Sequence, residues 1–469
     1  MIEIHWRNPA RRTAVALLIS LMALILAGCE PASPQRRHLD ETDRLIIDRT
    51  GQKFDAGELL KLARPAQSPP TGALTLEEAV ARSLQHNNAL IAATENLTIA
   101  RAQVAQASLV QNPTLGQSNG LLFPFASHGL PSFDINVTQV INSILTQPSR
   151  VAVARLAEMQ AQIDLAAQGF GLSQQAQSKY QELSHLIRSR RNTERVVEVY
   201  GRAVKAAEAR QQVGLIPMPE LNRARLNYTD AVRQVRHLQT QYQRAAQEMN
   251  WLMGLSSPPL WKLSDDALQP PQELPPPPEI PLLESAALKY RLDLLRGDFD
   301  RRLGEFGVKL ARAGLIPNTT VGAEFARDNT KRWVGGPVFD ISIPIFDPGL
   351  VALTLAEDQS RKADKTYAAL CGQVLQDVRT AQANFQIASD DLRFFREKLI
   401  PQQEQNVALM QESFRLGNDD LDALLNTLRD YVAALQSYED ATQAYQDSST
   451  ALQAAVGLAW NQMMKRAGA

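Results

Sequence analysis

Three acidic residues, Asp419, Asp420 and Asp422, lie together after a predicted tight turn at residues 415–418. An apolar helical pattern begins directly after them. Carboxylates at the start of a helix accept hydrogen bonds from its free N–H groups and offset the positive end of its dipole. Helix capping is therefore the simplest chemistry for Asp419 and Asp420. Asp422 lies further into the helix and is a candidate for a separate role.

Other chemistry-bearing residues do not combine into a catalytic or metal site. The six histidines are scattered, and His185 and His237 have no partner at metal-ligand spacing. The sequence has no phosphate-binding loop, catalytic triad pattern or metalloprotease motif. We therefore predict no catalytic residues, no metal and no cofactor, and a protein that is not an enzyme. The net charge of -1 gives no basic excess, which argues against nucleic acid as a partner.

Cys29 stands at the end of an export signal. Three arginines precede an apolar run over residues 13–27, and the segment closes with Leu26-Ala27-Gly28-Cys29. The run is short for a membrane span, and its flanks have signal-peptide order. Residues 1–28 resemble a bacterial lipoprotein signal peptide, which implies that Cys29 becomes the lipidated first residue of the mature chain. By the same resemblance, Glu30 is compatible with sorting to the outer membrane.

The acidic cluster belongs to a predicted hairpin of two long helices over residues 348–458. Apolar residues recur from Leu370 to Leu399 and again from Leu421 to Val456, in alternating steps of three and four. This spacing averages 3.5 residues, which predicts two helices packed antiparallel as a coiled coil. Pro401 predicts a kink in the first arm. A solvated coiled-coil rod or dimerisation stalk would show the same pattern.

The order helix, two strands, long helix, turn and return helix occurs twice. Asn112 is echoed by Asn318, Gly214 by Gly417 and Tyr228 by Tyr431, at a displacement of about 203 to 206 residues. Such regularity indicates an internal duplication. The predicted divisions are the signal peptide 1–28, a lipidated tether 29–73 with one short helix near 57–63, a first repeat 74–255, a proline-rich extended connector 256–280, a second repeat 281–458 and a C-terminal tail 459–469.

Each repeat contains two predicted strands, at about 114–123 and 132–141 in the first and about 319–327 and 336–345 in the second. Apolar and polar residues alternate in them, which gives one lipid-compatible face and one mostly polar face. Strands of about ten residues suit an outer-membrane barrel. Pro337 and Pro344 weaken the last strand, so we place both at its ends or at a rim.

Four strands cannot close a membrane barrel, because such barrels begin at about eight strands. Open strands in lipid would leave backbone groups unpaired, at a cost of several kcal/mol each. Several copies must then share one barrel: two copies would supply about eight strands and three copies about twelve. A soluble four-stranded sheet on a helical protein is the alternative.

The sequence resembles the TolC-type outer-membrane efflux and secretion channels over about residues 74–458. The motifs that carry the resemblance, in order, are Leu74-Thr75-Leu76-Glu77-Glu78-Ala79, Ile341-Ser342-Ile343-Pro344-Ile345-Phe346-Asp347, Leu399-Ile400-Pro401 and Phe414-Arg415-Leu416-Gly417. The resemblance implies a mainly α fold with a membrane β-barrel portion. It implies a homotrimer with a twelve-stranded barrel among outer-membrane lipids and a coiled-coil tunnel across the periplasm of a Gram-negative bacterium.

The resemblance also implies partners and working residues. A periplasmic adaptor and an inner-membrane pump would serve this passive duct, with docking at the tips Gly214, Leu215, Arg415, Leu416 and Gly417. Acidic residues after the second turn, Asp419, Asp420 and Asp422, would lie near the periplasmic entrance. Asp422 matches the first acid of the family's Asp-Val-Leu-Asp pattern, but the run here reads Asp422-Ala423-Leu424-Leu425-Asn426, without the second acid. Three copies of Asp422 at a narrow pore would repel one another and favour cations.

Three functions are compatible with these features. The first is the exit channel of a tripartite efflux pump for small molecules or metal ions. The second is the exit duct of a type I protein secretion system, which could share the same architecture. The third is a non-conducting, lipid-anchored periplasmic coiled-coil scaffold, which would be held on the membrane by Cys29 alone.

Overall fold

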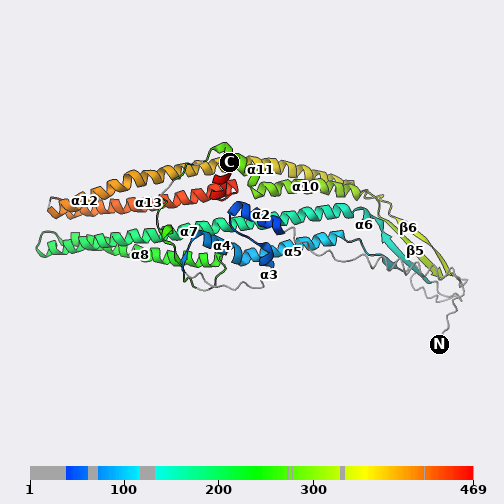
Figure 1. Cartoon of the computed structure of the whole chain (residues 1–469), viewed down its shortest axis with the longest axis horizontal. Helices are drawn as coiled ribbons and strands as arrows, with labels where there is room; N and C mark the ends of the chain where they lie inside the picture. The colour runs from blue at the N-terminus through cyan, green and yellow to red at the C-terminus, as the bar shows by residue number, and fades with distance from the viewer. Residues whose placement is uncertain are drawn as a thin grey trace, which may run out of the picture.

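The computed structural model describes residues 39–61, 72–116, 133–256, 258–271, 274–276, 278–327, 333–416 and 418–467. These residues form an elongated molecule with two helical hairpins at one end and an antiparallel sheet at the other (Figure 1). The predicted signal peptide and Cys29 lie outside the described residues. None of the described helices is both long enough and apolar enough to cross a membrane.

The first repeat begins with the capped helix that the sequence predicts. The Thr75 hydroxyl accepts a hydrogen bond from the Glu78 N–H at 3.2 Å and starts α4 (Leu76–His86). Directly after α4, the Asn87 side chain caps α5 (Asn88–Ser108). The repeat continues through β2 (Thr114–Gly116), β3 (Phe133–Val140), α6 (Ile141–Leu145), α7 (Gln147–Gln212) and α8 (Met218–Leu252).

The second repeat has the same plan. Its elements are α9 (Ile280–Tyr290), α10 (Leu292–Ala313), β5 (Thr319–Arg327), β6 (Trp333–Ile341), α11 (Leu350–Phe394), η3 (Phe395–Leu399), α12 (Ile400–Leu416) and α13 (Leu421–Val456). The predicted apolar seam is buried on both arms, for example at Val378 and Phe385 in α11 and at Leu428 and Leu452 in α13. The long coiled-coil hairpin is therefore confirmed.

A π-helical turn, η3, lies directly before Pro401. Proline has no N–H, and its ring crowds the carbonyl four residues earlier, so a regular α-helical turn is disfavoured there. The wider turn accommodates the proline, and the helix continues through it as α12. The irregularity that we expected at Pro401 therefore takes the form of a π turn.

The sheet combines strands of both repeats in the order β2-β3-β5-β6, with all pairs antiparallel. Its register places Val137 opposite Ala323, and Ala323 opposite Pro337. One face consequently carries apolar side chains such as Phe339, which is 67% exposed, while Asp340 belongs to the other face. The predicted alternation is confirmed, and the apolar face is open to its surroundings.

The strand boundaries differ from prediction in two places. β6 ends at Ile341, and Pro344 lies beyond it, where the Ser342 N–H donates to the Asn318 carbonyl at 2.9 Å. Pro337 is in the interior of β6, so its predicted place at a strand end is wrong. An edge strand tolerates proline, and β6 pairs only with β5 among the described strands. In the first repeat, residues 117–132 lie outside the described part, and residue 141 already belongs to α6.

The prediction of a tether is wrong for residues 39–61. These residues form α2 (Leu39–Thr50) and α3 (Ala56–Lys61), and Ile46 is fully buried against Gly169 of α7. The Arg49 side chain also donates to the Tyr290 carbonyl at 2.9 Å. The segment was missed because α2 has few apolar residues, Leu39 and the consecutive Leu45, Ile46 and Ile47, which is too few for a visible period.

The C-terminal residues are likewise folded rather than a tail. They form α14 (Trp460–Ala467), whose Met463 is buried and whose Trp460 ring lies 5.3 Å from the Phe385 ring. The Ala459 N–H donates to the Arg49 carbonyl at 2.7 Å, which joins the C-terminus to α2. The connector contains β4 (Lys262–Leu263), which pairs with β1 (Ala73–Leu74), and a 3-10 turn, η2 (Asp265–Leu268).

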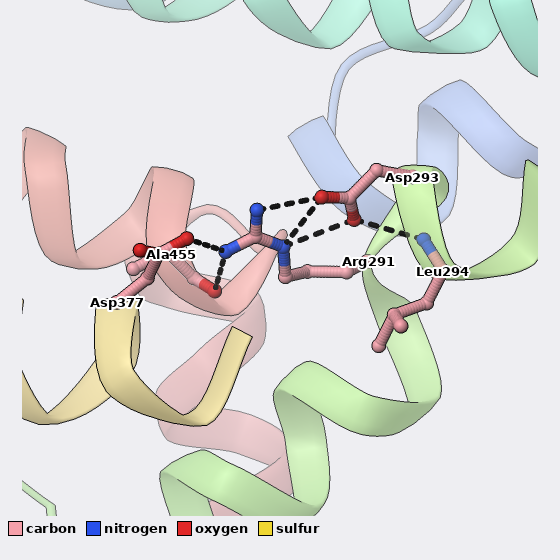
Figure 2. Close-up of polar contacts among 5 residues, drawn as sticks. All are labelled: Arg291, Asp293, Leu294, Asp377 and Ala455. Carbon is pink, nitrogen blue, oxygen red and sulfur yellow. Dashed lines mark hydrogen bonds and ion pairs between the residues drawn. The ribbon is translucent and has the colours of Figure 1, made fainter. Parts of the chain in front are cut away.

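Each repeat closes on itself at an equivalent joint. In the first, Asn87 Nδ2 donates to the Leu252 carbonyl at the end of α8 (3.0 Å). In the second, Arg291 donates to the Ala455 carbonyl (3.3 Å) and to Asp293 and Asp377 (Figure 2). Asp293 in turn accepts from the Leu294 N–H and so takes over the capping role of Asn87. The two repeats therefore form this joint at equivalent positions, Asn87 and Arg291.

A glycine with positive φ completes each joint. A Cβ atom on Gly254 (φ +72°) would lie 2.0 Å from the His86 carbonyl oxygen, and one on Gly457 (φ +78°) would lie 3.1 Å from the Arg291 Cα atom. Only glycine combines this conformation with so close a backbone approach. The two glycines thus set how closely the return helix of each hairpin approaches the preceding helix pair, which is α4 and α5 in the first repeat and α9 and α10 in the second.

We predict that Gly254→Ala lowers the free energy of unfolding by at least about 1 to 3 kcal/mol, from backbone strain alone. Urea titration of the purified protein measures this change. Gly307→Ala is the control, because that α10 position has nothing within 4 Å of an added Cβ and should gain about 0.5 to 1 kcal/mol. Equal unfolding midpoints for the two variants would contradict the requirement for glycine at position 254.

Asp43 makes the attachment of α2 pH-dependent. Burial, opposed by the hydrogen bond from the Ala56 N–H, raises the pKa of this carboxyl to about 6. Because the native pKa is above the ordinary value of 3.8, its ionisation destabilises the fold near pH 7, and this loss is relieved as pH falls below about 6. We predict a higher thermal midpoint for Asp43→Asn than for the wild type at pH 7.5, with the gap narrowing as pH falls below about 6 and closing only near the ordinary pKa of 3.8. A gap that does not change with pH would contradict this assignment.

Candidate functional site at the hairpin tips

The first hairpin turns at Gly214. The Gly214 N–H donates to the Gln211 carbonyl (3.0 Å) and the Leu215 N–H to the Arg210 carbonyl (2.9 Å), with Gly214 at φ +75°. These two bonds end α7 in a tight left-handed cap. Leu215 is consequently left at the extreme end, 73% exposed, and Val213 beside it is also exposed.

The second hairpin turns after Leu416, which is exposed like Leu215. The Asn418 N–H donates to the Ser413 carbonyl at 3.0 Å, and the Ser413 hydroxyl bonds to the Asp419 carboxylate. Arg415 is held by Glu412 of the same helix at 2.6 Å. Gly417 lies outside the described residues. The described tip residues thus present leucines at both turns and leave few polar groups unbound.

Two contacts tie the tips of the hairpins together. Arg223 of α8 forms an ion pair with Asp422 of α13 at 2.7 Å. Arg210 of α7 donates to the Phe414 carbonyl at 3.0 Å, and its guanidinium lies 3.8 Å from the centre of the Phe414 ring. Stacking on an aromatic face and a carbonyl bond suit the planar guanidinium group.

A shared apolar cluster lies directly behind these contacts. Its buried members come from all four helices of the two hairpins: Val196, Tyr200, Ala203, Ala207, Leu221, Ala224, Ala231, Phe414, Leu424, Leu425 and Leu428. Burial of this surface holds the hairpins side by side at their ends, as Figure 1 also shows. Any widening between the tips must therefore open both the polar links and this cluster.

The structure divides the three predicted acids among three roles. Asp420 caps α13, and its carboxylate accepts from the Ala423 N–H at 2.7 Å. Asp419 binds Ser413 instead of capping the helix. Asp422 lies at the boundary between the hairpins, and one of its oxygens has no hydrogen-bond partner. The expected cap is thus found for Asp420 and not for Asp419.

Sequence analysis missed the partners of Asp422 and Phe414. Arg223 and Arg210 are about 200 residues away in the chain, and no local spacing marks them among the many arginines of α7 and α8. No cluster of three or more His, Cys, Asp or Glu side chains suited to a metal ion occurs within the described ranges.

We predict that Asp420→Ala lowers the free energy of unfolding by about 1 kcal/mol, because α13 loses its N-cap. Urea titration measures the loss. Asp430→Ala, on the exposed surface of the same helix, is the matched control and should change stability by less than about 0.5 kcal/mol. If the two substitutions had the same effect, capping by Asp420 would be refuted.

Comparison with known proteins supports the architecture. Residues 283–458 match the outer membrane efflux protein family. No curated protein matches the chain in a sequence comparison. Among solved structures, CusC is 16% identical and has a TM-score of 0.69, with 84% of this chain and 98% of that chain covered.

Two further channels have the same fold. VceC, an outer membrane protein from Vibrio cholerae, is 16% identical with a TM-score of 0.66, and 82% of this chain and 96% of that chain are covered. The open state of the Neisseria gonorrhoeae MtrE outer membrane channel is 16% identical with a TM-score of 0.65, with coverage of 82% and 89%. Efflux proteins of this family are transport channels and not enzymes. Residues 283–458 therefore resemble the outer membrane efflux proteins, and the chain has the fold of the TolC-like outer membrane channels.

Proposed function

We propose that this protein is the outer-membrane exit channel of a tripartite efflux pump. The observation that carries the proposal is the joining of an open four-stranded sheet with an exposed apolar face to two long helical hairpins. Such a sheet needs other strands before it can enter lipid, because unpaired backbone groups are costly there. Three copies would supply twelve strands for one barrel, and their hairpins would form the wall of a periplasmic tunnel.

The tips would then form the periplasmic entrance. The exposed Leu215 and Leu416 would contact a periplasmic adaptor, together with Gly214, Arg415 and Gly417. The Arg223–Asp422 pair would hold neighbouring hairpins together while the channel is closed, and opening would separate them. An inner-membrane transporter would supply the substrate, a small molecule or metal ion, and all of the energy. Cys29 would anchor the chain to the outer membrane by its lipid.

Single-channel recording in planar bilayers tests this proposal. We expect discrete openings from the wild type and a higher open probability from Asp422→Ala. Each exposed ion pair contributes about 0 to 1 kcal/mol, so the loss of three pairs predicts a rise of about tenfold. Asp430→Ala lies on the exposed surface of the same helix, and it should behave like the wild type.

The possible results distinguish an error in the entrance residue from an error in the proposed function. If the protein conducts but Asp422→Ala has no effect, the channel stands and the entrance residue is wrong. If a folded, lipidated oligomer never conducts, even with Asp422→Ala, a lipid-anchored scaffold replaces the channel. In that case a Cys29→Ser form would leave the membrane altogether.

A further inference from the structure

The two hairpins contact one another differently along their length. In the body of the molecule the buried apolar residues form two separate clusters, one that contains Leu165 and Met249 and another that contains Phe385 and Leu452. Only the tips share an apolar cluster. Between these regions α7 meets α13, where hydrogen bonds join Arg188 and Asn192 to Glu439 and Thr450 to Gln181. This polar stretch joins the hairpins at the middle of their length.

A buried ion pair is at the centre of this stretch. Arg188 Nε of α7 lies 3.0 Å from Glu439 Oε2 of α13, and each side chain is 5% exposed. The other carboxylate oxygen of Glu439 accepts from Asn192 Nδ2, also at 3.0 Å. Arg188 Nη1 donates to the Ala267 carbonyl of η2 at 3.2 Å. The pair therefore joins both hairpins and the connector at one point.

His185, a titratable neighbour of this ion pair on α7, adds no positive charge beside it. Burial lowers the pKa of His185, one turn earlier on α7, so its ring stays neutral near pH 7 and adds no cation beside Arg188. One nitrogen of Arg188, Nη2, has no partner. Desolvation of two charges offsets most of their attraction, so a pair of this kind adds little net stability. A role other than stability is needed to explain it.

Neither the coiled-coil seams nor the overall charge fixes how far one hairpin lies along the other. Seams whose apolar residues recur in steps of three and four look alike after a slide of one helical turn. The first hairpin, residues 147–252, has 15 Lys and Arg against 9 Asp and Glu, whereas the second, residues 350–456, has 9 against 16. These dispersed charges attract at many alignments. A single buried pair is satisfied at only one, because any slide would leave two buried charges without partners.

We propose that Arg188 and Glu439 are positioning residues that set the register of α13 on α7. That register brings Arg223 opposite Asp422 and Arg210 opposite Phe414 at the tips. The register is a property of the folded single chain and does not depend on the proposed channel function. Its consequence, that the entrance closes correctly only when the pair is intact, rests on the proposed channel function.

The test compares single and double substitutions. Arg188→Met or Glu439→Leu alone leaves one buried charge unpaired, so each should lower the thermal midpoint strongly. The double variant Arg188→Met/Glu439→Leu removes both charges and should recover the midpoint of the wild type. A merely structural pair predicts the same stabilities, so a second measurement must report the register.

Distances between spin labels provide that measurement. Labels at Thr229→Cys in α8 and Ala451→Cys in α13 occupy exposed positions on the two hairpins, in a Cys371→Ala background. The two positions lie at different distances from the tips, so the line between the labels runs mainly along the helix axes and its length reports a slide. A sample of the Cys371→Ala protein without the two introduced cysteines measures the signal from label attached elsewhere, which is then subtracted. We expect one narrow distance in the wild type. In the double variant we expect a broadened or second peak, displaced by about 5 Å, because a slide of one helical turn is about 5.4 Å.

The matched control is Arg393→Met/Asp390→Leu, which removes an exposed ion pair within α11 and should leave the distance unchanged. If the double variant at the buried pair keeps one unshifted peak, the positioning role is refuted. If that variant fails to fold, Glu439→Gln, which keeps the bond to Asn192, must broaden the peak or the proposal fails. Channel recordings on the same proteins are independent: a wild type that never conducts rejects the proposed function and leaves the distance result to decide the register.

Discussion

Unpaired backbone groups at the two edges of the sheet impose the main constraint on this protein. Within the described residues β2 pairs only with β3, and β6 pairs only with β5, so each edge offers free N–H and C=O groups. Water can satisfy such groups but lipid cannot. The exposed apolar face of the same sheet, with Phe339 and Ile341, requires an apolar environment. In the proposed channel, shared strands between copies would satisfy both requirements, and the two long hairpins would then surround a common axis.

The remainder of the fold holds these hairpins at a fixed place relative to the sheet. Gly254 and Gly457 allow each return helix to approach the backbone of the preceding helix pair, and the Arg291 network reinforces the second joint. The N-terminal α2 and the C-terminal α14 close the middle of the molecule around Arg49. Towards the tips the hairpins are joined first by the buried Arg188–Glu439 pair and then by a small apolar cluster with exposed polar links. Contacts that are few and partly exposed suit a region that must separate.

The sequence alone predicts the features that depend on local periodicity. The seams of α11 and α13, the start of α4 at Thr75 and the alternation in β5 and β6 all follow from residue spacing. Features that depend on distant residues were missed. α2 and α14 are short and owe their order to packing on other helices, and Pro337 lies inside β6, which is at the edge of the sheet within a single chain. The links of Asp422 to Arg223 and of Arg188 to Glu439 join residues about 200 to 250 apart, which no motif reveals.

The central claim is that several copies complete one barrel. Light scattering on the full-length protein in detergent, with the detergent mass subtracted, tests it most directly. The account predicts a single species of about three times the 51.8 kDa chain. A folded monomer would contradict a shared barrel, and a dimer would contradict the twelve-stranded form.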